Sequence, residues 1–355
     1  MKAAVFHAAN DIRIEEVDDP GALESDEVLI RPAFAGICGT DLHEFTSGPI
    51  LIPVTPHPLN GAQAPQILGH EFSATVVDTG TAVTSLRCGD QVAVLPASWC
   101  GDCAACLRGQ HQVCSRLAAL GLSSPWGGLG ELAVTKANQL TVLPENVSLL
   151  QAGLLEPAAV AATAVGRSLV VPGGSMLIVG GGPIGALCAL YAYASGVAQI
   201  LLSEPNAQRR RLLEALDVAV VLDPNDQDVR EIVGDHTRGG GVDAAVEVAG
   251  NETALNLCID AVRPQGVVVQ TALHSKSASI EPLKVAMKDI SIQGTWCWQV
   301  WEWPRLVDLV ATGRFPVEKI VTRQIQLDDL VTEGFNSLLD PTSGDVKILV
   351  DVQGT

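Results

Sequence analysis

The chain has 355 residues, which is long for one compact domain and comfortable for two. Hydrophobic residues make up 47% of it, so there is enough apolar material for buried cores. Its formal net charge is −18, and a surface this negative repels nucleic acid and anionic lipid, so we expect neither as a partner.

Targeting signals and cysteine usage indicate where the protein works. The first residues, MKAAVFHAANDIRIEE, contain no apolar run of signal-peptide length, and Gly and Pro break the later apolar runs well short of a membrane span. Four of the nine cysteines fall within residues 100–114, and in a reducing compartment such a cluster more often binds metal than forms disulfides. We therefore expect a cytoplasmic protein.

Two rhythms follow one another along the chain. Residues 1 to about 155 carry short β-branched runs between turn signals, at 28–36, 74–80 and 90–96, which is typical of a β-rich unit. From about residue 175, strands alternate with helices, which predicts a parallel, doubly wound α/β sheet. The strands are expected at 175–182 (where the run ends in glycines), 198–205, 218–224, 242–250 and 265–273, and the helices at 183–196 and 206–216, the latter capped by Asn206. The pattern loosens after about 290, and 346–352 predicts a last strand.

The stretch CGDCAACLRGQHQVC predicts a closed metal site. Its cysteines, Cys100, Cys103, Cys106 and Cys114, supply four thiolates from one loop, as tetrahedral zinc requires. The seven-residue last gap and the missing Pro disfavour a bacterial iron–sulfur cluster, and disulfides remain the non-metal alternative. Four thiolates leave no open position, so we expect a structural zinc and look for the chemistry elsewhere.

A second set of ligand types is scattered over three segments. Cys38 lies in GICGTDLHE, His70 in LGHEF and Glu156 in LLEPAAVAA. Alone, each is more often a buried small residue, a structural histidine or a carboxylate at a helix start. Together with a closed zinc lobe and a dinucleotide-binding pattern, they predict a three-ligand zinc site with one open position, as catalytic zinc requires.

The glycines of GGGPIG predict a dinucleotide site. They match G-x-G-x-x-G, follow a predicted strand and open a predicted helix, whose free N–H groups attract phosphate. Glu204 ends the next strand, where a carboxylate binds a ribose and repels a 2′-phosphate, so NAD is favoured over NADP. The arginines at 209–211 could instead accept that phosphate. The candidate cofactor residues are Gly180, Gly182, Pro183, Ile184, Gly185, Glu204 and Arg209.

The motifs CGTDLHE, GHEF, the four-cysteine lobe, LLEPAAVA and VGGGPIG, in this order, resemble the zinc-dependent medium-chain alcohol and polyol dehydrogenases over essentially the whole chain. Within that family, residues 47–59 and 202–210 resemble the butanediol dehydrogenases. The resemblance implies an α/β protein with a GroES-like β-rich catalytic domain (1–156 and 291–355) and a Rossmann cofactor domain (157–290). It also implies NAD, two zinc ions per chain, and a homodimer or homotetramer.

The resemblance assigns roles to single residues. Cys38, His70 and Glu156 match the catalytic zinc ligands, and Glu71 matches a carboxylate near the metal that can replace water on it. Thr40 matches the hydroxyl that takes the substrate proton, and His43 the group that passes it to solvent.

The implied substrate is a small secondary alcohol or vicinal diol, with 2,3-butanediol, acetoin and diacetyl first. Sorbitol-, threonine- or glucose-type dehydrogenases share this scaffold and stay open as alternatives. A zinc- and nucleotide-binding protein without turnover is the alternative of another class; the presence of a proton relay beside an open metal triad argues against it.

Overall fold

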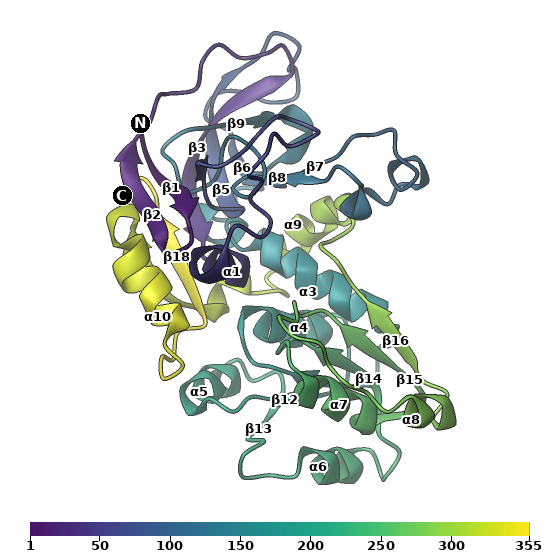
Figure 1. The fold of residues 1–355 in the computed structure, drawn as a ribbon. Coiled ribbons are helices and arrows are strands. Elements are labelled where there is room, and N and C mark those ends of the chain that lie inside the picture. The colour runs from purple at the N-terminus through teal and green to yellow at the C-terminus, as the bar shows by residue number, and fades with distance from the viewer. Residues whose placement is uncertain (355) are drawn as a thin grey trace. The chain divides into compact units, whose positions relative to one another are not determined.

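The structure, a computed structural model, describes residues 1–354, which form two compact units (Figure 1). Unit 1 comprises Met1–Glu156, Gln299–Gly313 and Val321–Thr355, and unit 2 comprises Pro157–Trp298 and Arg314–Ile320. Unit 2 continues past residue 290 because β16 (Ser291–Gly294) pairs with β15 (Val262–Gln270) and completes its sheet.

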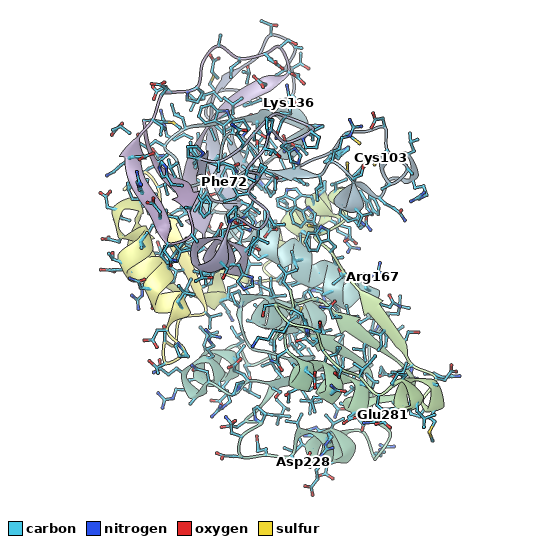
Figure 2. The ribbon with its side chains drawn as sticks, viewed as in Figure 1. Phe72, Cys103, Lys136, Arg167, Asp228 and Glu281 are labelled. Carbon is cyan, nitrogen blue, oxygen red and sulfur yellow. The ribbon has the colours of Figure 1, made fainter. Side chains whose placement is uncertain are left out.

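Unit 1 is built on mainly antiparallel sheets, although its last two strands pair in parallel. Its largest sheet has the order β10-β6-β5-β3-β18-β17, with β9 also pairing with β3, and a smaller one has the order β2-β1-β4. Their bounds are β1 Lys2–Ala8, β2 Asp11–Glu16, β3 Glu27–Gly36, β4 Gln66–Ile67, β5 Glu71–Thr79, β6 Gln91–Val94, β9 Ala133–Lys136, β10 Leu140–Val142, β17 Val321–Gln326 and β18 Lys347–Asp351. The alternating side chains Val28 and Ile30 point into the core that also holds Phe72, labelled in Figure 2.

Helices interrupt unit 1 where the sequence pattern predicted only strands and loops. They are α1 (Gly39–Ser47), α2 (Leu149–Ala152), α9 (Trp303–Ala311) and α10 (Asn336–Leu339). Helix α1 lies within the CGTDLHE motif and was missed because its nine residues carry little apolar periodicity. Its start is fixed instead by Asp41, whose Oδ2 accepts the Cys38 N–H at 2.9 Å.

Unit 2 contains one six-stranded, all-parallel sheet with the order β13-β12-β11-β14-β15-β16. Its remaining strands are β11 Ser175–Val179, β12 Gln199–Ser203, β13 Val220–Leu222 and β14 Val242–Glu247. Its helices are α4 Pro183–Ala194, α5 Ala207–Ala215, α6 Val229–His236, α7 Glu252–Ala261 and α8 Pro282–Met287, while α3 (Leu155–Arg167) leads into the unit. The doubly wound α/β fold predicted from the sequence is therefore confirmed.

The strand order of unit 2 reverses at a defined point. The chain winds outward from β11 to β12 and β13, then returns to place β14 on the other side of β11. Loops that follow β11 and β14 therefore diverge at the carboxyl edge, where parallel sheets bind ligands. The predicted strands and helices occur here with shorter bounds, and β15 begins earlier than expected, at Val262. Among the described residues, no helix is long and apolar enough to cross a membrane.

Candidate functional site

The four cysteines of the lobe converge between β7 (Ala97–Ser98) and β8 (Ala118–Ala119). The Sγ–Sγ distances are 3.9 Å for Cys100–Cys106, 3.9 Å for Cys103–Cys114 and 3.4 Å for Cys100–Cys114. Tetrahedral zinc with Zn–S bonds of about 2.3 Å separates its sulfurs by about 3.8 Å. All nine cysteines are free, so the disulfide alternative does not describe this lobe, and its donor set fits zinc.

Backbone amides prepare the lobe for a cation. The N–H of Cys106 donates to Cys103 Sγ at 3.5 Å, and the N–H of Arg116 donates to Cys114 Sγ at 3.3 Å. Donors from Cys106 and Ser115 lower the pKa of Cys103 to about 5, so this thiol is a thiolate at neutral pH. Burial raises the pKa of Cys106 to about 12, which favours the protonated thiol. A bound metal would instead favour the thiolate. Cys103 is labelled on this lobe in Figure 2.

Helix α1 carries one candidate metal ligand and the two residues that the sequence predicts to handle the proton. Cys38 is its N-cap, and the Thr40 hydroxyl lies 3.7 Å from Cys38 Sγ. His43, one turn further on, is exposed to solvent. The helix thus places Thr40 beside the candidate metal position and His43 at the water side.

Cys38, His70 and Glu71 form the second metal-binding group of the described residues, with one ligand atom of each lying within 4.8 Å of the others. His70 and Glu71 enter the site at the start of β5, after the left-handed Gly69 (φ +96°). A side chain at Gly69 would meet the Leu129 backbone nitrogen at 2.7 Å, so the close turn requires glycine.

Glu156 lies outside this group of three, in the first turn of α3. It is only 7% exposed, and the charges of the group affect its pKa. Burial and then the charge of Glu71 raise the pKa of Glu156 to about 8. Burial and then Glu71 also raise the pKa of the Cys38 thiol. Several acidic groups therefore lie close together in this site, and a divalent cation would stabilise their ionised forms.

Asp41 is a site residue that the sequence reasoning missed. It is fully buried, and its Oδ1 lies 3.4 Å from His70 Nδ1, within ion-pair range but without hydrogen-bond geometry. Burial lowers the pKa of His70, but Asp41 and then Cys38 outweigh it and raise that pKa well above its usual value. A carboxylate behind a ligating histidine fixes which ring nitrogen faces the metal. The sequence signal for Asp41 was its position inside the CGTDLHE motif.

The glycine loop after β11 fits a pyrophosphate. Gly180 has φ +114°, and a Cβ on Gly185 would lie 1.9 Å from the Gly180 carbonyl oxygen, so α4 packs on the loop only with glycine there. At Gly182, by contrast, nothing lies within 4 Å of an added Cβ. Pro183 begins α4, and Ile184 follows in its first turn, where free amides attract phosphate.

Glu204 holds the glycine loop in place through hydrogen bonds. It is buried at the end of β12, and its Oε2 accepts the Gly181 N–H at 2.7 Å. Its Oε1 accepts the N–H of Asn206, the cap of α5, at 2.8 Å. The carboxylate therefore ties the glycine loop to the β12–α5 turn and keeps its remaining lone pairs for a ribose.

The structure separates the arginines that the sequence left ambiguous. Arg210 pairs with Asp223 at 2.5 Å and donates to the Pro205 carbonyl oxygen at 2.7 Å. The Nε of Arg209 is buried without a hydrogen-bond partner. Arg209 is thus the better candidate for a cofactor contact.

Further polar groups at the carboxyl edge of unit 2 were missed. The hydroxyls of Thr271, after β15, and Thr295, after β16, are buried without hydrogen-bond partners. Glu247, at the end of β14, is fully buried and pairs with His274 Nε2 at 2.9 Å. Polar residues directly after buried strands were the available signal, and the unpaired hydroxyls fit a polar ligand at this edge.

Comparison with known proteins identifies the family. Residues 24–145 match the alcohol dehydrogenase GroES-like domain and residues 183–312 the zinc-binding dehydrogenase domain. An "(R,R)-butanediol dehydrogenase" of Bacillus subtilis (strain 168) is 37% identical over 99% of both chains. A "Probable diacetyl reductase", (R)-acetoin forming, of Saccharomyces cerevisiae is 29% identical over 99% of this chain and 90% of the relative. The crystal structure of 2R,3R-butanediol dehydrogenase from Bacillus subtilis superposes with a TM-score of 0.92, at 36% identity over 99% of both chains. The chain therefore belongs to the zinc-dependent alcohol dehydrogenase family.

Proposed function

We propose that this oxidoreductase interconverts 2,3-butanediol, acetoin and diacetyl with NAD as the hydride carrier. The observation that carries the proposal is the joint presence, in one chain, of the Cys38–His70–Glu71 group, in which His70 and Glu71 are buried, and the glycine loop after β11. The full-length similarity to butanediol dehydrogenases supports the substrate class.

In this proposal, each chain binds two zinc ions. Cys38, His70 and Glu156 would hold the catalytic ion, with Glu71 beside it, and the four lobe cysteines would hold the structural ion. When bound, the catalytic zinc supplies Lewis-acid polarisation of a hydroxyl or carbonyl oxygen. The lobe supplies no chemistry, because four thiolates fill a tetrahedral sphere.

Proton removal falls to α1. Thr40, whose hydroxyl lies next to Cys38, would accept a hydrogen bond and then the proton from the substrate hydroxyl while it releases its own hydroxyl proton toward His43. His43 passes the proton to water from its exposed position on the same helix. In the reverse direction, the same two residues return a proton to the substrate oxygen when the carbonyl is reduced.

Cofactor binding falls to the carboxyl edge of unit 2. When bound, NAD supplies the hydride chemistry. The amides around Gly180, Gly182 and Gly185 bind its pyrophosphate, with Pro183 and Ile184 opening the helix that faces it. Glu204 accepts hydrogen bonds from the adenosine ribose and repels a 2′-phosphate, while Arg209 contacts the adenosine side.

The remaining assignments are part of the same proposal. Unit 1 carries zinc binding and catalysis, and unit 2, whose sheet extends beyond residue 290 to β16, carries dinucleotide binding. A homodimer or homotetramer, working in the cytoplasm, is proposed; β16 ends the strand order of its sheet and carries the exposed Ile292. An edge strand with free backbone groups suits pairing with a second copy.

The first test measures NADH formation or consumption with the stereoisomers of 2,3-butanediol, with acetoin and with diacetyl, and repeats the assay with NADPH. Each assay is run before and after strong chelation and after zinc restoration. Turnover that chelation abolishes and zinc restores is expected. Activity only on sorbitol, threonine or glucose would refute the butanediol assignment, and no turnover on any alcohol in protein that holds both zinc ions would refute catalysis.

A matched variant separates the two metals. Cys38→Ser should reduce the zinc content from about two to about one per chain, because it removes a ligand of the catalytic zinc and leaves the lobe untouched. Turnover should be abolished, because it needs the catalytic zinc. Full activity in Cys38→Ser would contradict the assignment of the catalytic site.

A further inference from the structure

A completely buried lysine lies beside the candidate catalytic metal group. Lys347, the first residue of β18, is 1% exposed. Its ammonium forms an ion pair with Glu71 Oε2 and donates to the Ile37 carbonyl oxygen at 2.9 Å. The sequence pattern predicted only a strand here. An unpaired buried ammonium is costly, so the Glu71 partner is a condition for this lysine to be buried at all.

The ion pair crosses over one strand, and a glycine makes the crossing possible. In the sheet, β3 lies between β5, which carries Glu71, and β18, which carries Lys347. Gly36 of β3 is in register with Glu71 on one side and with Leu349 on the other. A Cβ on Gly36 would lie 2.4 Å from Glu71 Oε2 and 2.8 Å from Lys347 Cε. The pair therefore fills the space that a side chain at Gly36 would need.

Charge counting shows why the pair matters to a metal. The Cys38 thiolate and the Glu156 carboxylate balance a divalent cation, with His70 neutral, and the buried Asp41 carboxylate behind His70 already adds one negative charge. Glu71 adds one further negative charge in the same buried site, and Lys347 cancels it. Without Lys347, the Glu71 carboxylate would be buried without a compensating charge, which is strongly unfavourable. Binding to the cation would then be the remaining way to stabilise this carboxylate.

We propose that Lys347 is a positioning residue that holds Glu71 out of the ligand set of the catalytic metal, and that Gly36 supplies the room for this hold. The inference rests on the proposed function. Lys347 keeps the fourth ligand position available to the substrate oxygen. Loss of the lysine releases Glu71 to ligate the metal and to compete with the alcohol.

The test uses Lys347→Met in full-length protein whose catalytic site is loaded with Co²⁺, with zinc in the lobe. The visible absorption spectrum is recorded without substrate or cofactor, because the Co²⁺ bands report the ligand set directly. Lys347→Met is expected to change this resting spectrum, and Lys347→Met with Glu71→Gln to return it toward that of the wild type. The KM for butanediol should rise about 10–100-fold in the single variant, the range that outer-shell partners of metal sites command.

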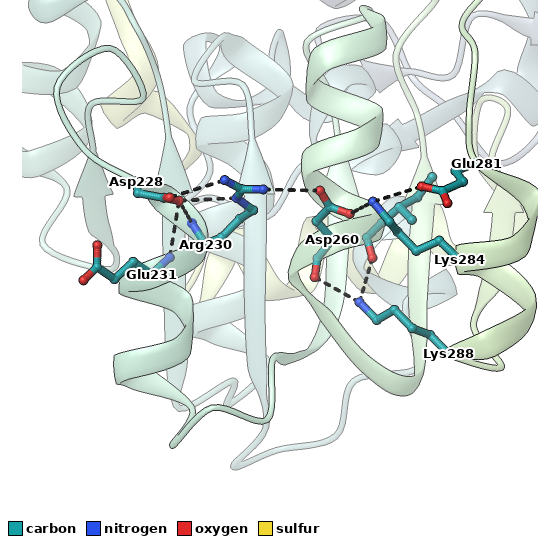
Figure 3. A network of polar contacts seen from close by, with 8 residues as sticks. Asp228, Arg230, Glu231, Asp260, Glu281, Lys284 and Lys288 are labelled. Carbon is teal, nitrogen blue, oxygen red and sulfur yellow. Dashed lines mark hydrogen bonds and ion pairs between the residues drawn. The ribbon is translucent and has the colours of Figure 1, made fainter.

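A matched control is a lysine of the other unit. Lys288 is partly buried, and its ammonium donates to the carbonyl oxygens of Ile259 and Asp260 at 2.8 and 2.9 Å. Figure 3 labels Lys288 and Asp260 in this network. Lys288→Met removes the same charge from a partly buried position in unit 2 and should leave the cobalt spectrum and the KM unchanged. An equal change in this control would overturn the inference.

Glu71→Gln alone tests the proposal even where Lys347→Met does not fold. With Glu71 outside the ligand set, this isosteric change should leave the cobalt spectrum as in the wild type; a clear change would refute the proposal. A folded, loaded Lys347→Met with the wild-type spectrum would refute it as well. If the wild type takes up metal only in the lobe, the proposed function itself fails, which is a distinct result.

Discussion

Gly185 offers a sharp test of how the cofactor loop is built. An alanine there would place its Cβ 1.9 Å from the Gly180 carbonyl oxygen and 3.3 Å from Val248 Cγ2. Ordinary contacts of this kind lie beyond about 3 Å, so the loop and the start of α4 must separate by roughly 1 Å or more. Overpacking of a buried contact against backbone costs about 3 kcal/mol. We expect Gly185→Ala to lower the melting temperature of unit 2 by roughly 6–12 °C.

The same displacement should weaken cofactor binding. The amides that we propose bind the pyrophosphate would move apart from one another, and a loss of about 1.4 kcal/mol already means tenfold weaker binding. NADH fluorescence titration should therefore give a dissociation constant raised about tenfold or more in Gly185→Ala. This measurement needs neither substrate nor metal, so it reports on the loop alone.

Two other glycines separate stability from binding. Gly182→Ala meets no atom within 4 Å and keeps an ordinary φ of −69°, so it should leave melting unchanged but weaken NADH binding by filling the space of the ligand. Gly166→Ala, in an open position of α3, should stabilise by about 0.5–1 kcal/mol and leave NADH binding unchanged. Wild-type melting and binding in Gly185→Ala would refute the reasoning.

Three further outcomes are expected. Cys103→Ser should lower the zinc content by about one ion per chain and unfold the lobe, while Cys88→Ser, an exposed cysteine outside it, should keep both ions, as metal analysis and limited proteolysis would show. Burial raises the pKa of Asp243, but the Arg263 donor and the Ser175 donors outweigh it and hold that pKa below its usual value. A depressed pKa stabilises the fold above the unfolded value of about 3.9, so the advantage of the wild type over Asp243→Asn in denaturant unfolding should vanish as the pH falls from about 4 through the folded pKa; a constant difference would contradict this. Asn251→Ala removes the side-chain cap of α7, which accepts the Ala254 N–H at 2.9 Å, and should cost about 1 kcal/mol in the same assay.

Local motifs in the sequence were sufficient for the parts of the protein that local spacing controls. The lobe is the clearest case, because four cysteines within one short loop can reach a common metal without help from the rest of the chain. The parallel sheet of unit 2 followed equally well, since each βαβ unit carries its own strand run, turn glycine and helix start. Asn206 was recognised as a cap for the same reason, and its side chain accepts the N–H groups of Gln208 and Arg209.

Tertiary structure decided what depends on residues far apart in sequence. Lys347 reads as one polar residue in an apolar strand, and only the sheet order brings it to Glu71 across Gly36. Asp41 stands inside a recognised motif, yet its place behind His70 follows from how α1 meets β5. Arg209 and Arg210 are neighbours in the sequence, and only the fold pairs one with Asp223 and leaves the Nε of the other without a partner. Spacing along the chain determines which chemical groups are available, whereas charge pairing, burial and free space depend on packing between segments and are set only when the chain folds.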